Sequence, residues 1–482
     1  MITFHPIFFS SGLFLTALSL AMVPPLITDY MHEDINWQAF AISIGITLFS
    51  GLLLTLANRP SGNVRLSVRD TFLLTAINWL LMAFFSALPF IYSNSTNTLT
   101  DSFFEAISGL TTTGATVLHG LDFTSPGIVL WRSLLQWFGG IGIIITALTV
   151  MPILKIGGMQ LFRNEFSDRS EKILPHASQI ATAILLTYLF FTVICGFCLW
   201  FAGMDILEAV CHALSTISTG GFSTVSTSIS HFNSVAIEII LMVFMIIGSI
   251  TLILFVRLFQ GEPQELWRDT QVRTFLAIIV IASISLTLWR WNEGTEFLTS
   301  LRESAFNTIS VITTTGYSSS DYHQWGSFPI TFFFLLMMIG GCTGSTSGGI
   351  KVFRYQIMFS VARSQIAQMR RPHGVFLASY NHKPIPEGIF ISVFTFFALF
   401  VLCFGSLAIT LSLYDLDFLT CTSAAIAALN NIGPGLGDLI GPDGTYAPLP
   451  DSAKWLLMIG MILGRLEYVT ILILFSPGFW KN

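Results

Sequence analysis

The stretch DSFFEAISGLTTTGAT, from Asp101 to Thr116, recurs three more times along the chain in altered form. The other copies are EAVCHALSTISTGGFS at Glu208 to Ser223, ESAFNTISVITTTGYS at Glu303 to Ser318, and TCTSAAIAALNNIGPG at Thr420 to Gly435. All four align without gaps on one glycine and on two apolar positions before it: Gly114, Gly221, Gly316 and Gly433; Ile107, Leu214, Ile309 and Ile426; Leu110, Ile217, Ile312 and Leu429. We call this segment the glycine module, a short helix-like run that ends in Ser, Thr or Asn and then glycine.

The composition places these modules in a membrane. Of the 482 residues, 53% are hydrophobic and only 10% are charged, whereas charged residues make up about 25% of a typical soluble domain. Uncharged segments approach or exceed the roughly 20 residues that a spanning helix needs: Pro6 to Pro24, Ala39 to Ala57, Ile180 to Gly203, Ile239 to Phe255, Phe275 to Trp289 and Ile389 to Leu413. Leu456 to Pro477 also qualifies, although Arg465 and Glu467 interrupt it. The sequence therefore predicts an all-α, polytopic membrane protein.

The modules divide the chain into similar units. Each module lies between two apolar segments, and successive aligned glycines are 107, 95 and 117 residues apart. This order predicts four units of helix, re-entrant loop and helix after an N-terminal pair, with about ten spanning helices and four re-entrant helices in total. We expect an extension at residues 1–69, and units at 70–173, 174–268, 269–384 and 385–482.

Charge sets the expected orientation. Most of the 22 Lys and Arg residues fall in connectors on one side of the predicted topology, and such basic loops remain in the cytoplasm. Both termini are then cytoplasmic. The opposite face is acidic and would raise the local concentration of cations; its residues are Asp29, Glu33, Asp34, Asp122, Glu293, Glu296, Asp321, Asp438, Asp443 and Asp451.

The module has the chemistry of an ion-binding loop. An acid near the helix start, Asp101, Glu208 or Glu303 in three copies and replaced by Thr420 in the fourth, suits the positive end of the helix dipole. The residues after each helix would run extended, and a ring of their carbonyls can replace the water around an alkali cation. These candidate site residues are Thr111, Thr112, Thr113 and Gly114; Ser218, Thr219, Gly220 and Gly221; Thr313, Thr314, Thr315 and Gly316; Asn430, Asn431, Ile432 and Gly433. A single copy taken alone would read as an ordinary helix C-cap, but four copies between spanning helices favour the ring.

A second motif, GGCTGSTSGGIK from Gly340 to Lys351, lies about 20 Å into the second helix of the third unit. Each glycine lowers helix stability by nearly 1 kcal/mol relative to alanine, so we expect a loop, the glycine loop, and interpret it as a gate. The alternative is a face of small residues for helix packing. The candidate gate residues are Gly340, Gly341, Cys342, Thr343, Gly344, Ser345, Thr346, Ser347, Gly348, Gly349, Lys351 and Arg465.

Arg465 belongs to this set because it lies equally deep in the last spanning helix. A charge at that depth needs a partner or a cavity, and loop carbonyls are natural acceptors for its five donors. We predict that Arg465 holds the glycine loop beneath the filter; the alternative is that it pairs with Glu467 or a distant carboxylate. Arg132 is expected to snorkel, and His212 and Trp137 to serve packing.

The order of units, the TTG- and STG-type loops and GGCTGSTSGGIK resemble the Trk/Ktr/HKT superfamily of potassium transporters, and the N-terminal pair is similar to that of its bacterial members. The resemblance implies a K+ pathway through the modules, K+ selectivity from a glycine in all four copies, and a homodimer in the bilayer of the bacterial inner membrane. It also implies a cytoplasmic nucleotide-binding regulator of the TrkA type. Because Asn430-Asn431-Ile432 replaces hydroxyl residues in the fourth copy, modest K+ over Na+ discrimination is expected.

Function is then expected to be K+ uptake through a channel-like selective pore, gated by the glycine loop and a cytoplasmic regulator. The alternative is a secondary transporter that couples K+ to H+ or Na+, for which broken helices in inverted halves and an intramembrane carboxylate would be typical. An enzyme is disfavoured because no cluster of His, Cys and Asp converges on the membrane plane. No organic cofactor, P-loop or nucleic-acid partner is expected in this chain.

Overall fold

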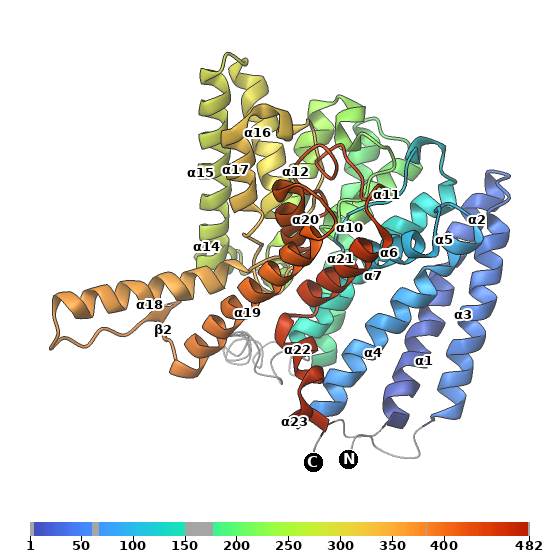
Figure 1. Ribbon diagram of the computed structural model, residues 1–482, viewed down its shortest axis with the longest axis horizontal. Helices are drawn as coiled ribbons and strands as arrows, with labels where there is room; N and C mark the ends of the chain where they lie inside the picture. Colours follow the sequence, from blue (N-terminus) through green and yellow to red (C-terminus); the bar gives the residue numbers. More distant parts are fainter. Residues whose placement is uncertain (1–3, 60–66, 150–176, 382, 481–482) are drawn as a thin grey trace.

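The structure is a computed structural model that describes residues 4–59, 67–149, 177–381 and 383–480. It is almost entirely helical, as the sequence predicts (Figure 1). The strands in these ranges are β1 (Ser379–Tyr380) and β2 (Lys383–Pro384), which pair antiparallel in a small hairpin. Both chain ends lie at the same end of the molecule (Figure 1).

An N-terminal pair and four units follow one another as the sequence predicts. The pair consists of one span made of α1 (Phe4–Ala21) and α2 (Val23–Met31), and a second span, α3 (Trp37–Ala57). The first two units contain α4 (Val68–Ser86), α5 (Leu88–Tyr92), α6 (Leu99–Leu110) and α7 (Pro126–Thr149), then α10 (Ala177–Phe201), α11 (Ile206–Ile217), α12 (Val235–Ser249), α13 (Leu252–Phe259) and α14 (Gln264–Arg268). The last two contain α15 (Thr270–Asn292), α16 (Phe297–Ile312), α17 (Ser327–Leu336) and α18 (Val352–Arg370), then α19 (Glu387–Ser412), α20 (Phe418–Asn430), α21 (Asp451–Arg465), α22 (Tyr468–Leu472) and α23 (Pro477–Trp480).

Six of these segments are long and apolar enough to cross a membrane by themselves: Phe4–Met31, Trp37–Ala57, Arg69–Tyr92, Gln179–Phe201, Thr270–Asn292 and Gly388–Ser412. Two more spans are sharply bent helix pairs, α12 with α13 at 98° and α21 with α22 at 112°. Counting each bent pair as one span, the described ranges contain eight spans by length and composition. Both apolar segments predicted at these places are bent, Ile239 to Phe255 after Ser249 and Leu456 to Pro477 after Arg465.

The N-terminal pair is attached to the first unit by a buried carboxylate. Asp29 is fully buried at the end of α2, and its Oδ1 accepts a 2.5 Å hydrogen bond from the amide of Gly127 in the first turn of α7. This contact satisfies one of the amides left unpaired at a helix N-terminus. The sequence placed Asp29 with the exposed acids of the outer face; it serves instead as a cap inside the protein.

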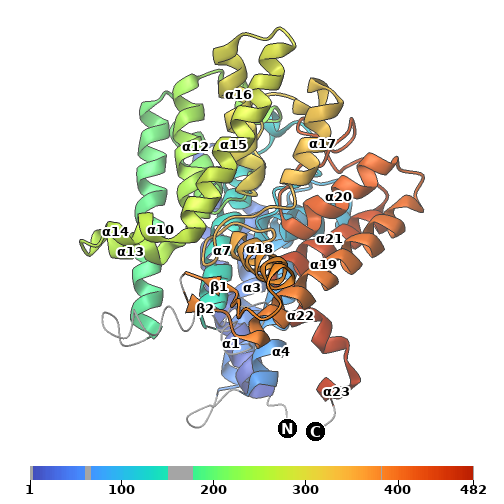
Figure 2. The same ribbon diagram turned by 90° about the vertical axis from the view of Figure 1, so that its left-hand side faces the viewer.

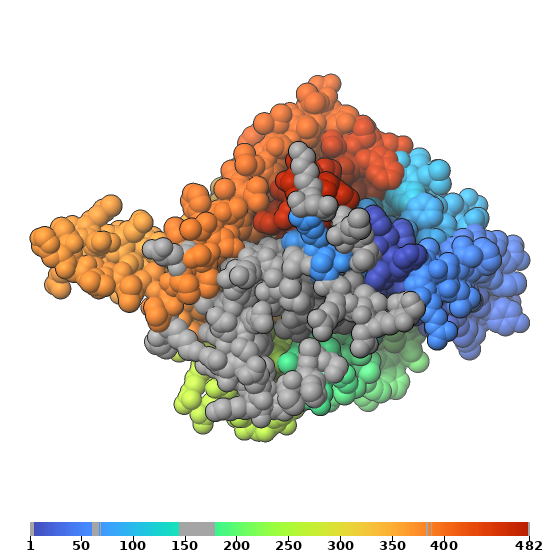
Figure 3. Space-filling model, turned by 90° about the horizontal axis from the view of Figure 1, so that it is seen from below, coloured from blue at the N-terminus to red at the C-terminus, as the bar shows by residue number. Residues whose placement is uncertain are grey.

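The four module helices, α6, α11, α16 and α20, form the interior. In α20, every residue from Thr420 to Asn430 is buried, including its polar ones. Many exposed apolar side chains lie on the spanning helices around them, for example Leu53, Leu186 and Ile281, as expected where the surrounding medium is hydrocarbon. By contrast, α18 and the β1–β2 hairpin extend away from the bundle as an arm, which is seen along its length in Figures 1 and 3 and end-on in Figure 2.

Candidate ion filter and gate

Three of the four module helices begin with a polar side-chain cap; α16 has none. Thr98 and Asp417 accept hydrogen bonds from the amides of the third residue of α6 and α20, and Asp205 forms a capping box with Glu208 in α11. These caps stabilise the positive helix ends. The third copy differs from the prediction, because α16 begins six residues before Glu303. That carboxylate lies in the second turn and pairs with Arg290 at 2.8 Å.

Each module helix ends in the same left-handed turn. The residue two positions before the aligned glycine has a positive φ, as does the glycine: Thr112 51°, Thr219 51°, Thr314 57° and Asn431 53°; Gly114 85°, Gly221 79°, Gly316 85° and Gly433 101°. In the first copy the amide of Thr113 donates back to Ser108 O at 2.8 Å, as in a Schellman cap. The predicted extended run is therefore wrong for its first two residues, which complete the helix end.

The four aligned glycines contact one another in cyclic order. A Cβ added to each would collide with, or closely approach, the carbonyl oxygen just before the aligned glycine of the next copy: Gly114 with Gly220 O, Gly221 with Thr315 O, Gly316 with Ile432 O, and Gly433 with Thr113 O at 2.7 Å. The contacts run from the first copy to the fourth and back to the first. Four segments separated by about a hundred residues therefore close into one ring.

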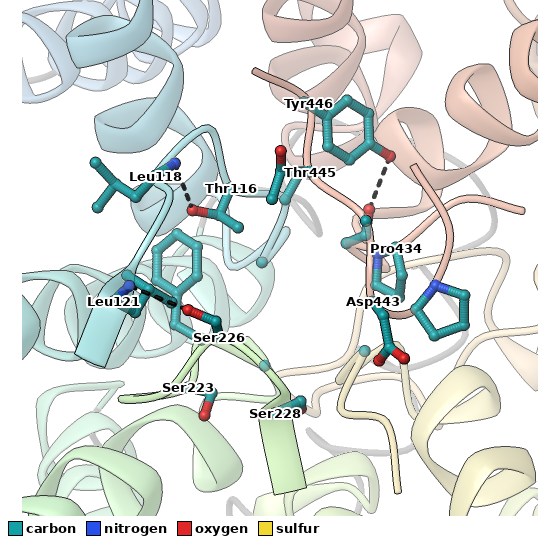
Figure 4. Close-up of a pocket in the computed structure, with 18 of the residues that line it drawn as sticks. Thr116, Leu118, Leu121, Ser223, Ser226, Ser228, Pro434, Asp443, Thr445 and Tyr446 are labelled. Atoms are coloured by element: carbon teal, nitrogen blue, oxygen red, sulfur yellow. Dashed lines mark hydrogen bonds between the residues drawn. The ribbon is translucent and has the colours of Figure 1, made fainter. Parts of the chain in front are cut away.

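A single cavity lies over this ring, and all four aligned glycines line it. Its walls come from the segments that follow the glycines, with Thr116, Ser223, Pro434 and Tyr446 among the lining residues (Figure 4). Tyr446 donates a 2.9 Å hydrogen bond to Gly433 O, which fixes the fourth segment. We call this cavity the vestibule; the partially negative C-termini of the four module helices end just beneath it.

The hydroxyl and amide side chains of the module mostly bond within the protein. Thr111 Oγ1 lies 2.7 Å from Thr113 Oγ1, and Thr313 Oγ1 lies 2.8 Å from Thr315 Oγ1. In the fourth copy, Asn431 Nδ2 donates to Thr113 Oγ1 at 2.9 Å. The asparagine thus ties the last copy to the first.

Sequence reasoning missed the residues that hold in place the return segments, which are the segments that follow each aligned glycine. Nine positions before the aligned glycine, three copies carry a polar side chain: Glu105, His212 and Asn307. Each bonds to the segment that follows its own glycine. Glu105 Oε2 accepts from Val117 N at 3.0 Å, His212 Nε2 lies 3.2 Å from Ser223 Oγ, and Asn307 Oδ1 accepts from Ser319 N at 3.2 Å. The gap-free alignment contained this signal.

The interpretation of Arg132 as a snorkelling residue is wrong. Its side chain is 1% exposed and bonds to Glu105 Oε1 at 2.7 Å through Nε, and to Ser223 O at 3.0 Å through an Nη atom. Its guanidinium also lies 4.0 Å from the ring centroid of Phe222. Because Glu105 belongs to the first copy and Ser223 to the second, Arg132 joins two neighbouring copies at the vestibule wall.

The glycine loop forms where the sequence predicts it and lies against the ring. α17 ends at Leu336 and α18 starts at Val352. Gly348 N donates to Thr314 Oγ1 at 2.7 Å, Thr346 Oγ1 lies 3.3 Å from Thr219 Oγ1, and a Cβ on Gly348 would collide with Asn430 O. The loop therefore contacts the second, third and fourth copies directly.

The same loop explains the break between α12 and α13. Cys342 N donates to Ser249 O at 2.9 Å, and Leu252 N donates to Gly344 O at 3.3 Å. These bonds replace bonds within a continuous helix, so the backbone turns at residues 249–251 instead of crossing straight. No pattern in the local sequence could have predicted a break produced by a segment about 90 residues away.

Arg465 contacts the loop, as the sequence predicts. Its two Nη atoms donate to Thr346 O at 2.9 Å and to Gly139 O in α7 at 3.3 Å. The alternative pairing with Glu467 is wrong, because Glu467 accepts two hydrogen bonds, 2.7 and 2.8 Å long, from Arg354 at the start of α18. Lys351 Nζ donates to Ser347 O within the loop.

Comparisons with known proteins agree with this architecture. A family model described as TrkH, cation transport protein, matches residues 36–481. The chain is 40% identical to the Trk system potassium uptake protein TrkI of Halomonas elongata over 96% of this chain and 94% of that protein. It is 36% identical to the Trk system potassium uptake protein TrkH of Escherichia coli K12, covering 98% of both chains.

A solved structure has the same fold. The crystal structure of the potassium transporter TrkH from Vibrio parahaemolyticus superposes with a TM-score of 0.91, at 33% identity and with complete coverage of both chains. The relatives of this chain are transport proteins and not enzymes, which agrees with the expectation from the sequence. From the family match, the near full-length identity and the shared fold, it follows that this chain belongs to the TrkH family of cation transport proteins.

Proposed function

We propose that this protein takes up K+ across the bacterial inner membrane through a channel-like pore whose filter is the ring of four glycine modules. The cyclic contact of Gly114, Gly221, Gly316 and Gly433 is the observation that carries the proposal. A closed ring whose backbone carbonyls surround one axis can replace the hydration shell of an alkali cation. The potassium uptake function of relatives at 36–40% identity supports K+ as the transported ion.

The glycine loop is the proposed gate. It lies against three copies of the ring, and Arg465 connects it to Gly139 in the remaining unit. A cation that has passed the filter would therefore meet a loop and a buried positive charge before reaching the cytoplasm. Movement of the loop away from Arg465 would open the path.

Regulation and assembly extend the proposal. The arm formed by α18 and the β1–β2 hairpin projects from the bundle and carries Arg363, Arg370 and Arg371. It offers a basic docking surface to a cytoplasmic nucleotide-binding regulator of the TrkA type, if both termini face the cytoplasm. We further propose that the protein is a homodimer and crosses the inner membrane several times.

A secondary transporter that couples K+ to H+ or Na+ is the alternative function. The observation in its favour is Glu105, a fully buried carboxylate that bonds to the vestibule residue Thr116 at 3.1 Å. Two spans are also broken. Against it, Glu105 is paired with Arg132, and the four units run in parallel topology and not as inverted halves.

The proposal is tested by reconstituting the purified protein into liposomes and measuring K+, Rb+ and Na+ flux with and without its regulator, followed by single-channel recording. We expect K+ and Rb+ flux above Na+ flux, and currents far above the rate of one-at-a-time carriage. A K+ flux that moves against its gradient when an H+ or Na+ gradient is imposed would establish the alternative. A K+ over Na+ ratio like that of a true potassium channel would contradict the modest selectivity proposed here.

A further inference from the structure

A second cavity lies apart from the vestibule, on the side of the protein. It has a volume of about 450 Å³ and lies between α1, α4 and α7, with Leu110 at the end of α6 closing its inner end. This volume falls within the roughly 300–1,000 Å³ of ligand pockets. Its lining is almost entirely apolar and includes Ala17, Trp79, Gly139 and Gly142. We call it the side cavity.

The side cavity lies at mid-membrane depth. Phe14, which lines it, is ten residues into the span that begins at Phe4, or about 15 Å. This is half of the roughly 30 Å hydrocarbon thickness. On the same helix, Leu13, Phe14 and Leu20 are 51%, 49% and 64% exposed. The medium next to the cavity is therefore hydrocarbon, and lipid tails are the molecules present at that depth.

Water is a poor occupant, because the lining is almost entirely apolar and two of its few polar side-chain atoms already have partners. Asn78 Oδ1 accepts a hydrogen bond from Ser11 Oγ at 2.5 Å, and Thr75 Oγ1 donates to Thr71 O at 2.9 Å. A buried water requires two to four polar partners. An empty cavity would deprive its walls of dispersion contacts, which an alkyl chain would restore.

We propose that the side cavity binds an acyl chain of a membrane phospholipid, and that this chain steadies the backbone to which the gate is anchored. Gly139 connects the two roles. It lines the cavity, and its carbonyl accepts a hydrogen bond from Arg465. A Cβ on Gly139 would also collide with Leu110 O, immediately before the filter residue Thr111. One face of α7 at Gly139 thus lines the cavity, while the same residue contacts Arg465 of the gate and the end of α6, just before the filter.

Binding is tested with fluorescence quenching by phospholipids brominated at mid-chain. Trp79 lines the cavity and is therefore the reporter. Its own quenching is obtained by subtracting the quenching of Trp79→Phe from that of the unmodified protein, both in bilayer nanodiscs. The blocking variant is Gly142→Leu, because a Cβ there meets only Trp79, at 3.8 Å, and a larger side chain would grow into the cavity. The matched control is Gly405→Leu on α19, where a Cβ meets nothing within 4 Å.

We expect Trp79-specific quenching that Gly142→Leu reduces severalfold and Gly405→Leu leaves unchanged. Absence of this quenching, or quenching that survives in Gly142→Leu, would overturn the proposal and indicate that a second copy or another segment fills the cavity. This measurement involves no ion, so it stands apart from the proposed transport function.

The effect on the gate rests on the proposed function and has a separate measurement. In liposomes, resting Rb+ flux of the unmodified protein should change with acyl chain length and saturation, whereas flux through Gly142→Leu should not. Equal lipid dependence in both proteins would refute a role of the chain at the gate anchor. Absence of Rb+ flux from every variant, with quenching intact, would instead count against the transport function alone.

Discussion

Arg132 Nε lies 2.7 Å from Glu105 Oε1, and the two residues are 1% and 0% exposed. The pair joins α7 to the module helix α6, and a further bond from Arg132 to Ser223 O reaches the second copy. The pair lies behind the ring and fixes the segments that follow Gly114 and Gly221, through Val117 N and Ser223 O. It is therefore a positioning pair for the filter, without itself touching the ring of carbonyls.

Replacing Glu105 by Gln should impair both stability and transport. The change leaves the Arg132 charge buried without its counter-charge, which costs about 3–5 kcal/mol when a buried pair is broken. The same uncompensated charge lines the vestibule and would repel cations. We expect a lower midpoint of thermal unfolding and a K+ flux that falls more than the amount of folded protein does.

The double variant Glu105→Gln with Arg132→Met is the matched control. Removing both charges should restore much of the stability, whereas K+ over Na+ discrimination should fall in the double variant because it loses the bond from Arg132 to Ser223 O. If the single and double variants unfold alike, the pair does not hold this part of the structure together.

The glycine ring was predictable from the sequence, and the Arg132 pair was not. The same backbone conformation and close contact recur in all four copies and require glycine. The repeated glycine at Gly114 and its equivalents is therefore visible in the sequence. Depth alone placed Arg465 beside the glycine loop. The partner of Glu105 depends on how α6 packs on α7, and the break near Ser249 depends on contacts from the glycine loop, so neither is visible in local sequence.

Substituting the ring glycines by alanine should reduce K+ selectivity in a graded way. Each position has a positive φ, and strained backbone costs about 1–3 kcal/mol per residue, or about tenfold for each 1.4 kcal/mol. A Cβ on Gly433 would lie 2.7 Å from Thr113 O, whereas one on Gly221 would lie closer to Thr315 O. We therefore expect Gly221→Ala to lower the K+ over Na+ flux ratio more than Gly433→Ala.

For this series, Gly388→Ala is a suitable control, since nothing lies within 4 Å of a Cβ at that position. It should leave the K+ over Na+ ratio unchanged. Equal ratios in Gly221→Ala and the unmodified protein, measured by flux in liposomes, would be incompatible with a filter at this ring.

Removing Arg465 should raise the resting leak. Arg465→Ala deletes the bonds to Thr346 O and Gly139 O together with the positive charge below the ring. Arg465→Lys keeps the charge but cannot reach both carbonyls with a forked group, so we expect an intermediate leak. The measurement is Rb+ flux without regulator, normalised to protein abundance.

Arg290→Ala serves as the control for Arg465, because it also breaks a buried ion pair, with Glu303, but on helices outside the gate. Its resting leak should match that of the unmodified protein. Unchanged leak in well-folded Arg465→Ala protein would mean that this arginine only holds helices together.

Flux should fall as the outer pH is lowered, through Asp443 in the vestibule wall. Burial raises the pKa of Asp443, and the negative charge of Asp321 raises it further. A carboxyl group with a raised pKa is charged only above that value, so the vestibule loses one negative charge as pH falls through it. K+ flux at low K+ concentration should decrease accordingly, and Asp443→Asn should abolish this step. A full pH dependence in Asp443→Asn would assign the titration to another group.

Breaking the Arg354–Glu467 pair should uncouple the arm from the gate. Arg354 lies in the first turn of α18 and is fully buried, and its guanidinium lies 3.5 Å from the ring centroid of Phe396. Glu467 has a φ of 64° and lies at the break between α21 and α22, two residues after Arg465. The pair therefore links the arm to the end of α21, where Arg465 lies. In Arg354→Met with Glu467→Gln, which leaves no unpaired charge, we expect normal K+ over Na+ selectivity but a much smaller flux response to the cytoplasmic regulator. An undiminished response would show that the signal reaches the glycine loop by another route.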